Sequence, residues 1–451
     1  MTKIQLKNYQ QQILDELEYL PSVALFMGTG SGKTYTSLFR VKENPTKNLL
    51  VVCPARVVEQ WQESIPKALP TYKIFEYPKS ASAKVKDKML LELEDDYNVV
   101  VVSLEVVAKL DSLLRIVDKS WTIIVDESHK IKEYGTARSP VKVTHRMLRL
   151  GDLTDYKILL TATPTQKEFG GYIDYYTQLR FLGFMNITKQ QFEDRYCNIK
   201  KMVVPGTPYP IKKIVGYKNT KELDSLLGLV ARRYVPKFTE DDPVMIEVRL
   251  PVTRSYIQLL KDKYYEDLDL SNISAMRMAK KTLTSGVVLG SDNFRERRTY
   301  VDNTIKRDWV EDFLSNTDEV VIIFYKYNVE REQLEDVCKN LKLKYIVING
   351  ANNHKKESIE SEGYRVVLGQ YNACGESIDG LQYRSHIVIY YAMPESSLEY
   401  VQSLGRIDRI GQEYVPTYYH LVMDKTIDAE IYKMTLNKVE FNTEVLDKLN
   451  I

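Results

Sequence analysis

A glycine-rich run, MGTGSGKT at residues 27–34, follows the apolar stretch SVALF and has the composition of a phosphate-binding loop. Its alternating glycines allow a tight turn in which backbone N–H groups point at phosphate oxygens. Lys33 adds a positive charge for the outer phosphates, and the Thr34 hydroxyl can ligate Mg²⁺. A strict P-loop has its first glycine where this chain has Met27, and a plain glycine turn before a helix is the alternative. The run predicts a nucleotide site made by Gly28, Thr29, Gly30, Ser31, Gly32, Lys33 and Thr34.

An acidic pair closes the apolar segment WTIIVDESHKIK, residues 121–132. Asp126 and Glu127 would lie at the carboxyl end of a strand, where doubly wound sheets bind their ligands. One carboxylate can hold Mg²⁺ while the other orients an attacking water. We therefore expect Thr34 and Asp126 to ligate the metal, and Asp126, Glu127 and Lys33 to be catalytic. An acidic pair that merely begins a helix is the alternative.

Two arginines stand three residues apart in QSLGRIDRIGQ, residues 402–412. If this segment is helical, Arg406 and Arg409 share one face and can reach a γ-phosphate held by another part of the chain. Such arginine fingers stabilise the charge on a transferring phosphoryl group. The alternative is a solvated helix face.

The elements that would position these residues are short apolar runs alternating with helical patterns. The first set contains SVALF, NLLVVC, YNVVVVS, WTIIVD and KILLTA, and the second contains EVVIIFY, LKYIVI, YRVVLG and SHIVIYY. Continuous apolar strands separated by helices indicate parallel sheets covered on both faces. The sequence thus predicts an α/β protein with two parallel-sheet lobes.

Between the two sets, residues 183–300 have a charged and mainly helical pattern, as in KELDSLLGLVARRY and YIQLLKDKYYEDLDL. The stretch VVPGTPYPIKK, residues 203–213, predicts a loop or small hairpin because its prolines break a regular ladder. We expect a first lobe over residues 1–182, a helical connector with the start of the second lobe over 183–300, and a second lobe over 301–451.

Composition excludes several classes of protein. A formal charge of +2 is too small for a general polyanion binder, so nucleic-acid contacts must come from local basic patches. The four cysteines are scattered, with no zinc-type spacing. The amino terminus has no apolar signal core, and the longest apolar runs are shorter than the roughly 18 residues that span a membrane. We expect no membrane association and a cytoplasmic protein, in the host cytoplasm if it is viral.

Several of these segments resemble motifs of the DEAD/DEAH superfamily of helicases, helicase superfamily two. DESH is similar to motif II, and LLTATPTQ, residues 159–166, to motif III. VVCPARVVEQWQESI resembles motif Ia of the Swi/Snf-like DNA translocases, and QSLGRIDRIGQ resembles their motif VI, with Asp408 where histidine is usual. LGQYNACGESIDGL stands in the place of motif V, where a plain strand-to-helix turn is an equal alternative.

This resemblance implies two RecA-like lobes, ATP and Mg²⁺ as cofactors, and Arg406 and Arg409 as the arginine fingers. LKNYQQQ is similar to the adenine-reading Q motif, which implies that Gln10 binds the base. An amphipathic helix is also compatible with this segment, because Gln10 lies off its apolar stripe.

The resemblance also implies a nucleic-acid-stimulated ATP hydrolase that moves along DNA. It implies that Arg56, Gln60 and Ser103 contact the DNA, without preference for its base sequence. Local basic patches exist in KSASAKVKDK, RMAKK and RERR, with exposed charged faces as the alternative. We expect a compact monomeric motor of phage or bacterial type, with duplex DNA and replication, recombination or repair proteins as partners. The alternatives are a strand-separating helicase for RNA or branched DNA, and a nucleotide-dependent clamp without turnover.

Overall fold

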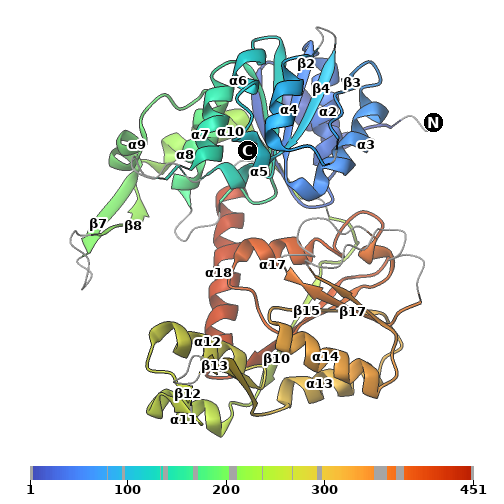
Figure 1. Cartoon of the computed structure of the whole chain (residues 1–451), viewed down its shortest axis with the longest axis vertical. Helices are drawn as coiled ribbons and strands as arrows, with labels where there is room; N and C mark the ends of the chain where they lie inside the picture. Colours follow the sequence, from blue (N-terminus) through green and yellow to red (C-terminus); the bar gives the residue numbers. More distant parts are fainter. Residues whose placement is uncertain are drawn as a thin grey trace. The chain divides into compact units, whose positions relative to one another are not determined.

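The structure is a computed structural model that describes residues 4–78, 80–93, 97–132, 134–135, 141–165, 171–202, 211–235, 237–266, 268–291, 297–349, 363–371 and 380–447. The chain divides into two compact units (Figure 1). Unit 1 comprises Met1–Pro236 and Glu440–Ile451, and unit 2 comprises Lys237–Val439. Each unit is described by itself below.

Unit 1 is built on a seven-stranded sheet in which every pair of neighbouring strands is parallel. The strand order is β3-β4-β2-β5-β6-β1-β9. The strands are β1 (Ser22–Met27), β2 (Asn48–Cys53), β3 (Lys73–Ile74), β4 (Asn98–Ser103), β5 (Trp121–Asp126), β6 (Tyr156–Leu160) and β9 (Ala231–Tyr234).

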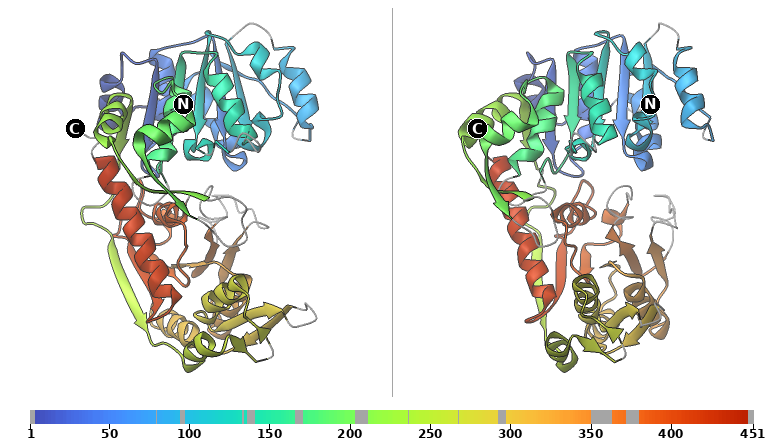
Figure 2. Two further views of the ribbon diagram at one scale, coloured as in Figure 1. Left: turned by 90° about the vertical axis from the view of Figure 1, so that its left-hand side faces the viewer. Right: turned by 60° about the vertical axis from the view of Figure 1, so that its left-hand side comes forward.

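Two hydrophobic cores cover the faces of this sheet, because alternate side chains of each strand point to opposite sides. In β1, Val23 and Leu25 join the core beneath α1 (Asn8–Glu16), α2 (Lys33–Glu43) and α3 (Val58–Ala68). Ala24 and Phe26 join the core on the other face, beneath α7 (Lys142–Gly151), α8 (Tyr172–Leu182) and α10 (Thr220–Val230). Helices on both faces, visible in Figure 2, explain why these strands are continuously apolar.

The remaining elements of unit 1 are short. They are α4 (Ala83–Leu90), α5 (Leu104–Val107), α6 (Leu113–Ile116), α9 (Lys189–Tyr196) and the antiparallel hairpin β7 (Cys197–Met202) and β8 (Ile211–Tyr217). This hairpin flanks the proline-bearing stretch, of which residues 203–210 lie outside the described residues.

Unit 2 contains a six-stranded parallel sheet with the order β10-β19-β18-β15-β17-β16. The strands are β10 (Val244–Leu250), β15 (Val321–Tyr325), β16 (Tyr345–Ile348), β17 (Val366–Gln370), β18 (Ile387–Tyr390) and β19 (Thr417–Met423). One face packs against α13 (Ile305–Ser315) and α14 (Asn328–Asn340). The other face packs against α17 (Ser397–Leu404) and the first turns of α18 (Ile427–Asp447).

A small subdomain with its own core is inserted between β10 and α13 of unit 2. It consists of α11 (Arg254–Asp262), the hairpin β11 (Tyr264–Tyr265) and β12 (Leu268–Asp269), α12 (Ile273–Leu283), and the hairpin β13 (Val287–Ser291) and β14 (Arg297–Val301).

The predicted α/β class with two parallel sheets is confirmed, and the predicted apolar runs form β1, β2, β4, β5, β6, β15, β16, β17 and β18.

The prediction that residues 183–300 are mainly helical is partly wrong. The helix expected to continue to Tyr234 ends at Val230, and residues 231–234 add strand β9 to the edge of the unit 1 sheet. Similarly, α11 ends at Asp262 and a hairpin follows. The three-part division at residues 182 and 300 stays a prediction.

None of the helices in the described part of the chain has both the length and the apolar character needed to cross a membrane.

Candidate functional site

The glycine-rich loop connects the carboxyl end of β1 to the first turn of α2. Gly30 and Gly32 have φ angles of 72° and 78°, in the left-handed region that favours glycine. A Cβ atom at Gly32 would lie 2.6 Å from the Gln10 Nε2 atom, so a side chain there would also collide with α1. Lys33 Nζ donates to the carbonyl oxygens of Met27 at 2.9 Å and Gly28 at 3.1 Å. The Lys33 side chain therefore lies across the loop, with its ammonium group at the place where the loop would bind phosphate.

Gln10 fastens α1 to this loop. Its side chain is 5% exposed, and Nε2 donates to Thr36 Oγ1 at 3.0 Å and to the Ser31 carbonyl at 3.2 Å. Its Oε1 atom accepts from the Lys7 backbone N–H at 2.8 Å. Its amide thus contacts the loop itself, and adenine recognition by Gln10 stays a prediction.

A pair of tyrosines that the sequence analysis did not select also supports the loop. Tyr9 and Tyr234 stack with ring centroids 3.9 Å apart and planes at 8°. The Tyr9 hydroxyl donates to the Ser31 carbonyl at 2.8 Å, and the Gly28 N–H donates to the Tyr234 carbonyl at 2.8 Å. Tyr9 adjoins Gln10 in the Q-like segment, but Tyr234 had no signal because its segment reads as helix.

The acidic pair lies at the carboxyl end of β5, as predicted. Asp126 accepts at both carboxylate oxygens, from Trp61 Nε1 at 2.9 Å and from the Glu127 N–H at 3.0 Å. Glu127 has φ 52° and ψ 52°, a left-handed conformation that is uncommon outside glycine and often marks a functional site. Its Oε2 atom lies 3.1 Å from His129 Nδ1.

The two carboxyl groups have opposite pKa shifts. Burial raises the pKa of Asp126, and the neighbouring charge of Glu127 raises it further. Burial also acts to raise the pKa of Glu127, but the hydrogen bond from His129 and the charge of Lys33 outweigh it and lower this pKa. Lys33 acts on both groups, so the loop and the acidic pair face the same space at the carboxyl edge of the sheet.

A hydrogen-bond network joins the acidic segment to the segment that resembles motif III. His129 Nδ1 lies 3.0 Å from Thr161 Oγ1, which also accepts from the Thr163 N–H at 3.1 Å. Ser128 Oγ donates to Gln178 Oε1 at 3.0 Å, and Gln178 Nε2 donates to the Pro164 carbonyl at 2.9 Å. Sequence reasoning identified both motifs but not these links, because Gln178 lies on α8 and joins them only in the folded chain.

The expected nucleic-acid contacts lie at the same carboxyl edge, on other strands. Arg56 and Gln60 follow β2 and are exposed, while Ser103 ends β4 and is half-buried. The neighbouring strands place Cys53 opposite Ser103, so the segments after both strands begin side by side. Ser103 also lines a cavity of about 490 Å³ together with Val58, Gln62, Tyr77 and Val106.

Arg406 and Arg409 lie in unit 2. Their segment is not helical, so the condition under which both arginines would share one helix face is not met. Helix α17 ends at Leu404, and residues 405–411 form turns, with the Arg409 N–H donating to the Ile407 carbonyl at 3.0 Å. Arg406 is buried and Arg409 is half-buried. Asp408 stands where histidine is usual in motif VI. Burial and the charge of Asp242 raise the pKa of Asp408 to about 6. The motif V residues 372–379 lie outside the described residues.

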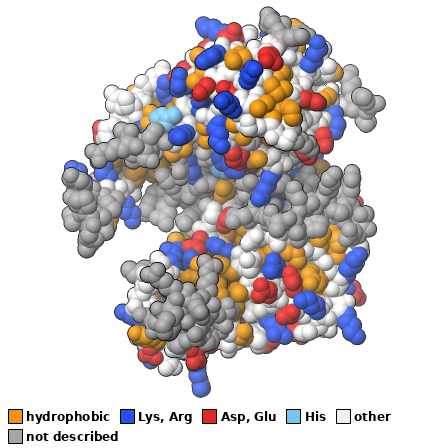
Figure 3. Space-filling model, in the orientation of Figure 1, with side chains coloured by type: hydrophobic (Ala, Val, Ile, Leu, Met, Phe, Trp, Pro, Cys, Tyr) orange, Lys and Arg blue, Asp and Glu red, His pale blue; other side chains and the backbone are white. Residues whose placement is uncertain are grey.

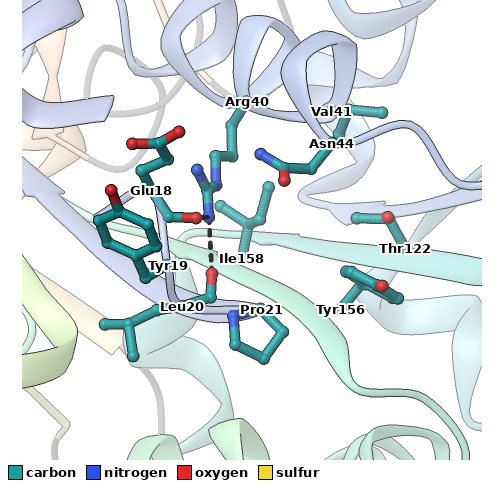
Figure 4. A pocket seen from close by; sticks show the side chains of 10 residues that line it. All are labelled: Glu18, Tyr19, Leu20, Pro21, Arg40, Val41, Asn44, Thr122, Tyr156 and Ile158. Atoms are coloured by element: carbon teal, nitrogen blue, oxygen red, sulfur yellow. Dashed lines mark hydrogen bonds between the residues drawn. The ribbon is translucent and has the colours of Figure 1, made fainter. Parts of the chain in front are cut away.

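A cavity of about 210 Å³ lies at the opposite, amino edge of the unit 1 sheet, lined by residues 18–21 between α1 and β1, by the end of α2 and by the starts of β5 and β6 (Figure 4). Arg40 crosses this region and donates through Nη2 to the carbonyls of Leu17, Glu18 and Leu20. These carbonyls follow the last turn of α1, so Arg40 closes the carboxyl terminus of that helix. We assign it a structural role.

The donor set at the carboxyl edge of unit 1 fits a magnesium nucleotide. The loop has the two left-handed glycines that let backbone N–H groups converge on phosphate, followed by an ammonium and a hydroxyl group at Lys33 and Thr34. Asp126 and Glu127 supply the hard oxygen ligands that Mg²⁺ prefers. No cluster of three or more His, Cys, Asp and Glu that could bind a metal by itself occurs in the described segments.

Comparison with known proteins agrees with the motifs. The chain is 25% identical to the Drosophila melanogaster SWI/SNF-related matrix-associated actin-dependent regulator of chromatin subfamily A-like protein 1, over 73% of this chain and 41% of that protein. It is 22% identical to the Bacillus subtilis ATP-dependent helicase YqhH, over 93% of this chain and 75% of that protein. It is 22% identical to the Gallus gallus DNA repair and recombination protein RAD54B, over 89% of this chain and 48% of that protein. The chain thus spans less than half of two of these relatives.

Among solved structures, the Sulfolobus solfataricus SWI2/SNF2 ATPase core in complex with dsDNA matches at 17% identity and a TM-score of 0.42, covering 99% of this chain and 97% of that one. The SNF2-related domain matches residues 18–281, which include the glycine-rich loop, the acidic pair and the segment that resembles motif III. Because this match covers more than half of the chain, the protein belongs to the SNF2-related domain family, the Swi/Snf-like branch of helicase superfamily two.

Proposed function

We propose that this protein is an ATP-driven motor that couples ATP hydrolysis to movement along duplex DNA. The main support is the placement of Lys33 where its charge acts on both Asp126 and Glu127, at the carboxyl edge of a parallel sheet. Family membership gives this arrangement its reaction class, phosphoryl transfer from ATP to water.

Each residue of the unit 1 site has a role in this proposal. The backbone of Gly28–Gly32 and the Lys33 ammonium group bind the triphosphate. Thr34 and Asp126 would hold Mg²⁺, which neutralises phosphate charge when it is bound. Glu127 orients the attacking water, and its contact with His129, which in turn contacts Thr161, fixes where its carboxylate points.

Residues outside this site complete the motor. We propose that Arg406 and Arg409 stabilise the charge of the transferring phosphoryl group. Arg56, Gln60 and Ser103 would contact backbone phosphates, which makes binding independent of sequence. The partners we propose are duplex DNA and proteins of replication, recombination or repair, with the motor itself acting as a monomer.

The test is a panel of ATPase assays with duplex DNA, forked DNA, single-stranded DNA and RNA at equal nucleotide concentration. We expect the largest stimulation with duplex DNA, about tenfold or more. We expect Lys33→Ala to reduce turnover by about 100-fold, because it removes a charge that acts on the transferring phosphoryl group. Greater stimulation by RNA or forked DNA would favour a strand-separating helicase. Hydrolysis that responds to none of the four nucleic acids would contradict the proposal.

A further inference from the structure

Three cations from two separate segments of unit 2 surround the carboxylate of Glu395. Lys281 Nζ forms a short hydrogen bond to Glu395 Oε1, and Lys326 Nζ donates to the same oxygen at 3.3 Å. Arg277 Nη2 donates to Oε2 at 2.7 Å. Both oxygens of one carboxylate are therefore bound by cations, as the oxygens of a phosphate group would be.

The charges in this cluster do not balance. Arg277, Lys281 and Lys326 carry three positive charges against the single charge of Glu395. Burial acts to raise the pKa of Glu395, but the contacts with Lys281 and Lys326 outweigh it and hold this pKa at about 2. Burial raises the pKa of the nearby Glu399, whose charge interacts with both Lys326 and Glu395, so three positive charges face at most two negative ones. The cluster thus has an excess of positive charge that Glu395 only partly neutralises.

The position of the cluster in the sheet is one at which ligands bind. Lys326 directly follows β15, and Glu395 lies five residues after β18. From β15 the chain continues to β16 and β17 on one side, and β18, β19 and β10 lie on the other. The order of strands reverses between β15 and β18, and open α/β sheets bind ligands outside the carboxyl ends of their strands at this kind of switch point.

The Lys326 backbone is fixed independently of its side chain. Glu330 is fully buried, and its Oε2 atom accepts from the N–H groups of Lys326 at 2.8 Å and Tyr327 at 3.0 Å. Ser285 Oγ donates to the other oxygen of Glu330 at 2.6 Å, which ties this loop to the segment following α12, the helix that carries Arg277 and Lys281. Buried hydrogen bonds therefore connect the loop that carries Lys326 to the segment that follows the helix of Arg277 and Lys281.

The accessibility of the cluster suits an extended ligand at the surface. The exposed fractions of the side chains are 62% for Arg277, 31% for Glu395, 30% for Lys326 and 14% for Lys281. A backbone phosphate can approach such a site from solvent, and each cation that replaces a condensed counterion adds to the salt dependence of binding.

We propose that Arg277, Lys281 and Lys326 form a binding site for a backbone phosphate of nucleic acid, and that Glu395 occupies it as an internal competitor until the phosphate displaces it. This inference rests on the proposed function for its ligand. It assigns the basic segment RMAKK a specific task and gives the chain a built-in brake on DNA binding, because the carboxylate must be displaced for the phosphate to enter.

The test measures binding of a labelled 20-base-pair duplex by fluorescence anisotropy between 50 and 200 mM salt. We expect Glu395→Gln to tighten binding about tenfold across this salt range, because the phosphate no longer has to displace a carboxylate, and to leave the slope of log K against log salt close to that of wild type. We expect Lys326→Ala to weaken binding and to make the slope shallower by up to about 0.9, the value for one phosphate contact. Because Glu330 holds the Lys326 backbone, this second variant tests the site without disturbing the loop.

Asp336→Asn is the matched control, because it removes one negative charge from an exposed ion pair with Lys339 elsewhere in unit 2. Equal effects of Glu395→Gln and Asp336→Asn would overturn the inference, as would weaker binding by Glu395→Gln in a protein with unchanged melting temperature. A parallel titration with an ATP analogue tests the other source of phosphate, and tighter nucleotide binding without tighter DNA binding would also overturn it.

The two proposals can fail separately. A wild-type protein that binds no duplex DNA would refute the proposed function. The phosphate site is then judged by the variants alone: DNA binding gained by Glu395→Gln and not by Asp336→Asn supports it, and no gain refutes it.

Discussion

At the scale of single residues, the acidic pair shows how one site keeps two carboxyl groups in different states. Asp126 is bound by the Trp61 indole and by the next backbone N–H, while Glu127 turns into the left-handed region and points at His129. Neighbouring residues of the same chemical type therefore have different environments. This separation suits a pair in which one member binds metal and the other directs water.

Trp61→Phe should shift the pH dependence of ATP hydrolysis. The Trp61 hydrogen bond lowers the pKa of Asp126, so its removal raises that pKa. Asp126 must be ionised to hold Mg²⁺, and activity is lost as the pH falls through its pKa. The acid limb of kcat/KM should therefore move to higher pH in Trp61→Phe.

The measurement is a pH profile of kcat/KM between pH 5.5 and 8.5 with saturating duplex DNA. Trp309→Phe is the matched control, because Trp309 packs against Phe313 and Tyr419 within unit 2. Identical acid limbs in the two variants would show that the indole does not tune Asp126.

At the scale of elements, α1 is held to α2 at both ends. Near the amino end of α2, Gln10 bonds the Ser31 carbonyl and Thr36. Near its carboxyl end, Arg40 binds three carbonyl groups of the turn that follows α1, two of them from Glu18 and Leu20, which Figure 4 shows. These carbonyls belong to the turn after the helix, and a guanidinium group is a strong donor for carbonyl groups. This clamp fixes the helix that carries the Q-like segment against the helix that begins with Lys33.

Arg40→Met should destabilise unit 1 by about 3 kcal/mol, because one buried and two partly buried carbonyl groups lose a charged donor. The measurement is urea denaturation in a Trp309→Phe background, where the remaining tryptophans, Trp61 and Trp121, both report on unit 1. Lys42→Met, at an exposed position of the same helix, should change the midpoint little. Equal midpoints for Arg40→Met and Lys42→Met would contradict the clamp.

At the scale of the whole molecule, the two units have separate cores and separate parallel sheets. On the face drawn in Figure 3, basic side chains are interspersed with acidic ones, in agreement with the small net charge. Recognition of a polyanion must therefore depend on local clusters of cations rather than on the overall field. Catalysis that needs groups from both units would make turnover a property of the whole chain.

Arg409→Ala should separate nucleotide binding from turnover. Unit 1 contains the phosphate-binding loop, so the affinity for an ATP analogue should stay within about twofold of wild type. Loss of the proposed arginine finger should reduce kcat by about 1,000-fold. The control is Arg331→Ala, which removes an arginine from the α14 surface of the same unit. Wild-type kcat in Arg409→Ala would refute the role of this residue.

The sequence by itself determined the class of fold, the strands that make most of both sheets, and the segments to which we assign the proposed chemistry. These features are encoded locally: buried parallel strands read as continuous apolar runs, and a glycine-rich turn before a helix requires glycine at left-handed positions such as Gly30 and Gly32. The acidic pair at the end of β5 followed from the same local pattern.

Only the tertiary structure decided which distant residues support these segments. Tyr234 stacks on Tyr9 because residues 231–234 form an edge strand, where pairing with β1 overrides a helical pattern. Trp61 reaches Asp126, Gln178 reaches the motif III segment, and Glu395 attracts cations from α12 and the end of β15. Such contacts depend on the crossing of strands and helices in three dimensions, which the spacing of residues along one chain does not specify.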